Sequence, residues 1–230
     1  SSGLLPQSYL RTDLVAVDLV VVIMVIITGR IVPLFTRNAT GDESIQMRAG
    51  LNTAAIVSVL LVALVEVFTS SGPLMAVAAG AAGLLVIVRA VHWGFLKTFQ
   101  QPILWILHIG HSWIGAGLLL KAVSAASLRV PPSVATHALT AGAIGTLTLG
   151  MMARVTLGHT GRQITASHLM TAGFFAITAS ALLRVLGPWL RADLTKPALI
   201  ASGVFWSLAF AVYLAVNVRF LLTPRPDGKP

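Results

Sequence analysis

Three histidines in this chain are spaced to act as metal ligands. His108 and His111 lie three residues apart, which places both side chains on one face of a helix. His137 lies near the start of the next apolar segment and enters from the opposite side, so its depth differs from that of His111 by roughly 10 Å. Neutral imidazole binds copper, iron and zinc. Ionisable side chains in apolar helices are costly and are usually kept for a function.

Several roles for these histidines stay open. His108 and His111 cannot be both axial ligands of one haem, because axial ligands approach the ring from opposite faces. They could bind one copper together, or one could bind haem iron while the other binds a second metal or forms a hydrogen bond. They could also be hydrogen-bonded packing residues. Gly115 lies on the face of His111 and leaves room for a flat cofactor or for a close helix.

A second polar group ends the long apolar stretch at 137–162. Arg154 is followed by the run Gly-His-Thr-Gly-Arg, which contains His159 and Arg162. Arginines can pair bidentately with carboxylates such as haem propionates, so these three residues are predicted to bind a cofactor. The alternative is that the arginines reach the lipid headgroups. Gly158 is predicted to cap the helix.

Other polar residues lie at the ends of apolar segments. Arg89 and His92 end one segment and are further candidates for the site. Arg30 lies between Gly29 and Pro33, a pattern that predicts a kink or an end of the first helix with Arg30 directed inward. The remaining candidates are Asp18 and Glu66, which we expect to pair with Lys121 or Arg184 or to belong to a proton route, and Met151 and Met152, which we expect to pack rather than to bind copper.

Composition shows which elements must position these residues. Apolar residues make up 56% of the 230 residues and charged residues only 10%, against about 25% charged residues in soluble domains. A membrane-spanning helix needs about 20 apolar residues. The sequence therefore predicts an all-α, polytopic transmembrane helix bundle that forms one domain over 1–230, with helices near 13–35, 50–70, 73–92, 102–123, 133–157, 165–187 and 196–222.

The charges fit a membrane topology. The net charge is +9, and the basic residues cluster at helix ends, so we expect no nucleic-acid partner. Ten Lys or Arg residues fall on one side of the predicted bundle and six on the other, which places the C-terminus in the cytoplasm. His92, Arg154, His159 and Arg162 are then predicted to gather at the cytoplasmic face.

The absence of certain motifs restricts the chemistry. The chain has no Cys, so thiolate metal sites and disulfides are excluded. It has no P-loop, no dinucleotide fingerprint and no nucleophilic triad. The chain begins SSGLLPQ without an initiating Met, and we expect it to be the C-terminal part of a longer membrane protein.

The chain resembles the NnrS family of bacterial membrane proteins at four segments. They are GRIVPLFTRN at 29–38, RAVHWG at 89–94, PILWILHIGHSWIGAGLLL at 102–120 and HALTAGAIGTLTLGMMARVTLGHTGR at 137–162. The last segment is the most specific, and the resemblance weakens after about residue 190. The position of His111 departs from the family pattern, which more often has an aromatic residue there. This departure shifts the predicted ligation toward His108 and His137.

The resemblance implies a function and a location. NnrS-like proteins have about twelve helices, contain haem and copper, and are linked to nitric oxide and nitrosative stress. This chain would then be the C-terminal seven helices of a protein of the bacterial inner membrane. The alternatives are a proton-coupled transporter or channel that uses the buried histidines, and a non-catalytic membrane subunit. The residues that the resemblance carries over are Arg30, Arg89, His92, His108, His137, Arg154, His159 and Arg162.

Overall fold

The computed structural model describes residues 7–69, 71–126, 130–226 and 228. Its described part contains seven helices that are long and apolar enough to cross a membrane, and no strand. The predicted all-α transmembrane bundle is therefore confirmed. The helices are α1 (Gln7–Thr40), α2 (Ala49–Phe68), α3 (Gly72–Ala90), α4 (Pro102–Ala125), α5 (Pro132–His137), η3 (Ala138–Gly145), α6 (Thr146–His159), α7 (His168–Leu190) and α8 (Thr195–Leu222), and α5, η3 and α6 together form one span.

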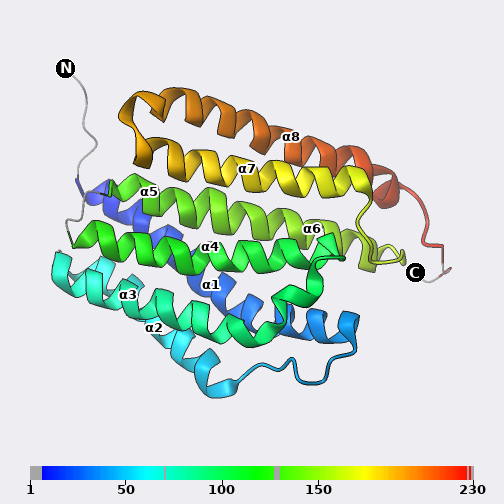
Figure 1. Ribbon diagram of the computed structural model, residues 1–230, viewed down its shortest axis with the longest axis horizontal. Coiled ribbons are helices and arrows are strands. Elements are labelled where there is room, and N and C mark those ends of the chain that lie inside the picture. The colour runs from blue at the N-terminus through cyan, green and yellow to red at the C-terminus, as the bar shows by residue number, and fades with distance from the viewer. Residues whose placement is uncertain (1–6, 70, 127–129, 227, 229–230) are drawn as a thin grey trace.

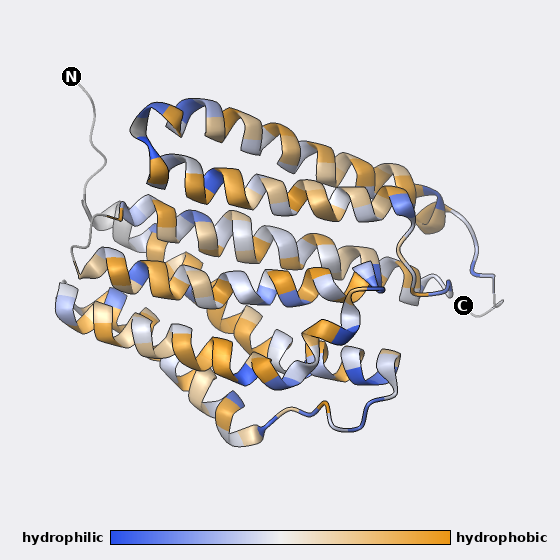
Figure 2. Cartoon of the chain, in the orientation of Figure 1, coloured by the Kyte–Doolittle hydropathy of each residue, from blue (hydrophilic) through white to orange (hydrophobic). Residues whose placement is uncertain are grey.

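Helix α4 is the centre of the bundle (Figure 1). It lies between α3 and the span formed by α5, η3 and α6, and α1 packs across it. Of the most apolar part of α4, 67% is buried, against 17% for α8 at the edge. Most residues along the helices are hydrophobic, and the most hydrophilic ones lie mainly near the helix ends and in the connecting segments (Figure 2). A site carried on α4 is thus enclosed by protein, whereas a site on α8 is open to lipid.

Two glycines allow α3 and α4 to approach closely. A Cβ on Gly115 would lie 2.5 Å from Ile87 Cγ1, and a Cβ on Gly83 would lie 3.0 Å from the carbonyl oxygen of Gly115. Small residues at such contacts are typical of packed membrane helices. Of the two roles considered for Gly115, the structure therefore shows helix packing rather than room for a flat cofactor.

The first helix is longer than predicted. It continues through Pro33 to Thr40, so the prediction that it ends at the Gly29–Pro33 segment is wrong. Pro33 is buried, and membrane helices tolerate proline when neighbouring groups satisfy the freed backbone. The prediction that Arg30 points inward is also wrong, because its side chain is exposed. The other spans agree with the prediction within a few residues.

The span from Pro132 to His159 changes its helical geometry on the way. Residues Ala138–Gly145 form a π-helix, η3, a wide geometry that often marks functional sites. The span ends at His159, and Gly161 adopts the left-handed conformation at φ 67°. The N–H of Arg162 then donates to the carbonyl of Leu157 at 2.9 Å. The C-cap of this helix is therefore Thr160, followed by the left-handed Gly161, and not the predicted Gly158.

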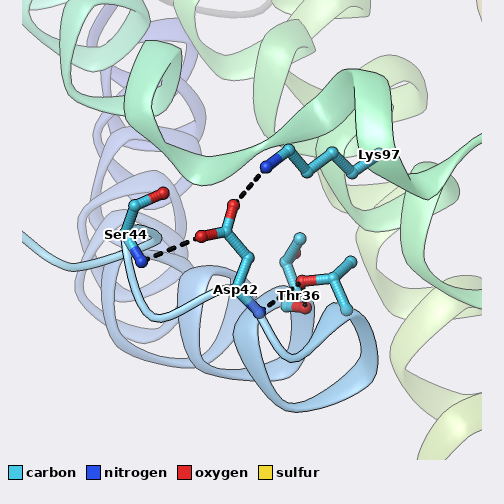
Figure 3. A network of polar contacts seen from close by, with 5 residues as sticks. Thr36, Asp42, Ser44 and Lys97 are labelled. Carbon is cyan, nitrogen blue, oxygen red and sulfur yellow. Dashed lines mark hydrogen bonds and ion pairs between the residues drawn. The ribbon is translucent and has the colours of Figure 1, made fainter.

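An ion pair connects two loops at one end of the bundle. Asp42, just after α1, forms an ion pair with Lys97 and accepts a hydrogen bond from the backbone N–H of Ser44 at 2.9 Å (Figure 3). These contacts hold the pKa of Asp42 low, at about 2. Of the basic residues used to orient the bundle, Arg129 and Lys229 lie outside the described residues, as does the side chain of Arg11.

Candidate functional site

Two histidines of α4 are fixed by two threonines of α1. His108 Nε2 lies 2.9 Å from Thr36 Oγ1, and His111 Nδ1 lies 3.0 Å from Thr28 Oγ1. All four side chains are buried. The three-residue spacing on α4 and the eight-residue spacing on α1 both repeat on one helix face, so the two pairs follow from the packing of α1 against α4.

Arg89 and Trp93 contact residues of this group from the side of α3. Arg89 Nη2 donates to the carbonyl of Val25 at 2.8 Å and to Thr28 Oγ1 at 3.4 Å. Its guanidinium lies 5.2 Å from the ring centre of Trp93, which in turn lies 4.5 Å from that of His111. We call this group the histidine cluster; it consists of Thr28, Thr36, Arg89, Trp93, His108 and His111.

The charge on Arg89 is buried without a counter-charge. Its side chain is only 3% exposed, and its Nε atom has no hydrogen-bond partner in the described part of the chain. No carboxylate among the described residues lies within ion-pair distance of it. Neutral acceptors hold it instead, including Asn52 Oδ1 at 2.9 Å. Gly29 makes this possible, because a Cβ there would lie 2.7 Å from Arg89 Nη1.

The protons available at His111 do not satisfy every contact. Thr28 Oγ1 lies 2.7 Å from the carbonyl of Met24, and His111 Nε2 lies 3.3 Å from the carbonyl of Val86. With the bond between Thr28 and His111, three contacts each need one proton. The hydroxyl and a neutral imidazole together supply two. With the proton on Nδ1, the contact with Val86 is lost. With the proton on Nε2, the Thr28 hydroxyl donates either to Met24 or to Nδ1, and the other contact is lost.

His108 is different, because its protons and contacts balance. Thr36 donates its hydroxyl proton to the carbonyl of Val32 at 2.9 Å and can accept from His108 Nε2. This arrangement makes Nε2 the protonated nitrogen. The lone pair of Nδ1 remains unused within the described residues. His108 therefore offers one nitrogen that could bind a proton or a metal ion.

A second polar centre lies near the other end of α1 and α4. Lys121 Nζ lies 2.6 Å from Asp18 Oδ2 and 3.0 Å from Glu66 Oε2. The expected pairing of these carboxylates with Lys121 is thus confirmed. Asp18 is 2% exposed, and the three side chains line a cavity of about 210 Å³. We call them the Asp–Glu–Lys triad, in which one ammonium is shared by two carboxylates.

The structure does not bring His137 to the other two candidate ligands. His137 is half-buried at the end of α5, on the side of Arg184, and makes no described contact with His108 or His111. No group of three or more His, Cys, Asp or Glu residues among those described could hold a metal ion. A metal at the histidine cluster would therefore have two imidazole ligands from α4.

The polar residues predicted at one membrane face lie at one end of the bundle but form no single site. Arg154 stacks on Phe35, with 3.8 Å from its guanidinium carbon to the ring centre. Arg162 donates to Thr223 Oγ1 at 2.7 Å. Two further candidates, His92 and His159, are exposed. Met151 and Met152 pack against the apolar core, as expected.

The sequence interpretation missed the partners of the histidines. Thr28 and Thr36 lie eight residues apart on an otherwise apolar helix, so they share a face. That spacing could have indicated a polar stripe. Trp93 lies inside the predicted RAVHWG segment, yet its neighbour His92 was selected instead. The exposed His92 and the buried Trp93 show that the direction of this short η1 helix (Val91–Trp93) could not be derived from the pattern.

Comparison with known proteins identifies the family. A family model described as NnrS protein matches residues 3–225 of the chain. No curated protein matches it. No solved structure matches it. The match covers all seven spanning helices and both polar centres. The chain is a multi-pass membrane protein and belongs to the NnrS family.

Proposed function

We propose that this protein acts in the response to nitric oxide in the bacterial inner membrane, and that the histidine cluster is its functional centre. The observation that carries the proposal is the pair of buried imidazoles on one face of the central helix α4. Buried ionisable groups in a membrane interior mark functional sites. The family supports the choice of nitric oxide, since NnrS-like proteins are linked to it.

Copper suits the donor set of the cluster. His108 and His111 are two neutral imidazoles, a ligand type that suits copper among other metals. His111 would offer Nε2 to the metal in the tautomer that gives up its contact with the carbonyl of Val86. His108 contributes a nitrogen that no protein contact occupies. Copper bound there would supply one-electron redox chemistry and a place for nitric oxide to bind. Thr28, Thr36 and Arg89 would orient the two rings through the contacts described above, as outer partners of metal ligands commonly do.

Haem does not fit at the cluster as the side chains are arranged. Trp93 and Phe95 fill the space beside the two histidines, with ring centres 4.5 Å from His111 and 5.6 Å from His108, respectively. None of the five cavities described in the protein is lined by either histidine. Haem, which the family resemblance suggests, would therefore need another place in the protein.

The response of the purified protein to nitric oxide tests this proposal. The wild-type protein, loaded with copper and reduced, should change its absorption or electron paramagnetic resonance spectrum when nitric oxide is added. A His108→Ala, His111→Ala double variant should show no such change. His168→Ala is the matched control, because His168 is exposed at the start of α7. Equal responses of all three proteins would refute the proposal.

The Asp–Glu–Lys triad favours proton-coupled transport as a second candidate function. Asp18 and Lys121 lie ten residues beyond Thr28 and His111 on the same two helices, roughly 15 Å along the bundle. Polar groups at both levels of the α1–α4 interface are what a proton route requires. Proton uptake by proteoliposomes, compared between the wild type and Asp18→Asn, tests this candidate. It fails if the two proteins behave alike.

A further inference from the structure

A groove lies between η3, α7 and α8, away from the histidine cluster. It has a volume of about 550 Å³ and is lined by Arg184, Trp206 and Phe210, among others. Trp206 is 41% exposed on a helix at the edge of the bundle, so the groove opens toward lipid. It is independent of the proposed function, because neither candidate function uses these residues.

Two glycines, Gly203 and Gly145, leave space in this groove. A Cβ on Gly203 would meet no atom within 4 Å, so this position faces open space. Opposite it, Gly145 of η3 lies close to the indole nitrogen of Trp206, 3.2 Å from where its Cβ would be. The rings of Trp206 and Phe210 stack with centres 4.3 Å apart and form an apolar wall.

Four hydrogen-bond donors in the groove lack partners. Arg184, Trp206 Nε1, Ser207 and Thr148 all line it, and none forms a hydrogen bond or an ion pair within the described residues. Arg184 lies six residues before the end of α7, roughly 9 Å along the helix. A charged side chain such as Arg184 that lies this far along a membrane helix without a partner is costly. The indole and the guanidinium can only donate, and Arg184 is charged, so a molecule that carries acceptors and a negative charge would complement both groups.

We propose that this groove binds a glycerophospholipid. Its phosphate would accept hydrogen bonds from Arg184 near the membrane surface, where arginine recognises phosphate well. Its ester carbonyls, which lie below the phosphate, would accept from Trp206. An acyl chain would cover the wall formed by Trp206 and Phe210. This occupant supplies both the counter-charge of Arg184 and the acceptors that the groove lacks.

Lipid retention measured by native mass spectrometry tests this site. The detergent-solubilised protein is mixed with phosphatidylglycerol, and the bound lipid per chain is counted. Gly203→Leu should abolish one specific binding event, because its side chain would occupy the groove that Gly203 lines, while its Cβ would meet no atom within 4 Å. Gly50→Leu is its control, since Gly50 also faces open space but lines no groove. Arg184→Gln should weaken retention about tenfold, the usual effect of losing a charge-assisted hydrogen bond. Lys196→Gln controls for the lost charge, because Lys196 is exposed.

Competing ligands identify which part of the lipid is recognised. Oleate carries a carboxylate but no phosphate or ester, and inorganic phosphate carries no acyl chain. Both should displace phosphatidylglycerol poorly. Equal displacement by either one overturns the proposal, as does full retention in Gly203→Leu. If Gly203→Leu instead converts a dimer to a monomer, the groove is covered by a second copy of the chain, and the lipid proposal is wrong.

Discussion

The histidine cluster and the groove between η3, α7 and α8 contain similar polar groups in opposite arrangements. In the cluster, threonine, histidine and arginine side chains from α1, α3 and α4 bind one another and are almost fully buried. In the groove, arginine, tryptophan and hydroxyl groups from α6, α7 and α8 line one cavity and form no hydrogen bond or ion pair within the described residues. Polar side chains inside a membrane bundle can therefore be present for two reasons, because they pair with one another or because they bind a ligand. The hydrogen-bond partners of each donor distinguish these two cases.

The largest expected effect comes from breaking internal pairing in the triad. Lys121→Met leaves Asp18 and Glu66 buried together without their cation. We expect a loss of about 3–5 kcal/mol in the free energy of unfolding, the usual cost of removing one partner of a buried ion pair. Unfolding in mixed micelles measures this loss. Arg184→Gln in the groove is the comparison and should cost little, since no internal pair is broken. Equal losses in the two variants would contradict the distinction.

Two glycines provide the next test. Gly29→Ala should push the Arg89 guanidinium away from Asn52, because the added methyl would lie 2.7 Å from Arg89 Nη1. We expect a loss of about 1–3 kcal/mol, as for other overpacked sites. Gly203→Ala adds its methyl to open space and should stabilise α8 by up to about 1 kcal/mol. The unfolding midpoints of both variants, measured in the same detergent, check this prediction. The midpoint should fall for Gly29→Ala and rise for Gly203→Ala, and shifts in the same direction would refute the prediction.

The threonines of the cluster should matter more than an ordinary helix threonine. Thr28→Val leaves His111 and Arg89 short of a partner, and we expect a loss of about 1–3 kcal/mol for the unsatisfied buried groups. Thr178→Val is the control, because Thr178 bonds only to the carbonyl of Phe174 in its own helix. The measurement is the free energy of unfolding of each variant. If Thr178→Val loses as much free energy of unfolding as Thr28→Val, the contacts of Thr28 in the histidine cluster contribute no extra stability.

The smallest effect concerns the loop after α1 and depends on pH. The Lys97 ammonium and Ser44 lower the pKa of Asp42 from 3.8 to about 2 in the folded protein. A group with a lowered folded pKa stabilises the fold above its unfolded pKa and loses that contribution as the pH falls through the folded value. We therefore expect a small decrease in the melting temperature between about pH 4 and pH 2. It should be absent in Asp42→Asn, and an identical decrease in that variant would rule out this assignment.

The sequence predicted the bundle well because the signals for spanning helices are local. Each span is a long apolar run, and its length decides whether it crosses a membrane. The i,i+3 spacing of His108 and His111 also predicted their common face correctly. Proline at position 33 misled the prediction of the first helix, since its effect depends on neighbouring helices that satisfy the backbone.

Partners across helices were harder to predict than positions along them. Which residue of α1 faces His111 depends on the rotation and depth of two helices, and neither follows from apolar composition. Arg89 illustrates the limit, because its type and its place at the end of a segment made it a site candidate but did not indicate its partners. Its burial follows from the space left at Gly29 and from the acceptor on Asn52. The groove was missed because Gly203 and Arg184 are nineteen residues apart on different helices.

Copper content measured residue by residue tests the central claim most directly. Each purified variant is equilibrated with copper(I), washed with a weak chelator and analysed for copper per chain, with its absorption spectrum recorded to detect haem. The account predicts that His108→Ala and His111→Ala each lose the bound copper. It predicts that His137→Ala, which lies apart from the cluster, retains it. Full copper in both cluster variants, or its loss only in His137→Ala, would contradict the assignment of the functional centre to the histidine cluster.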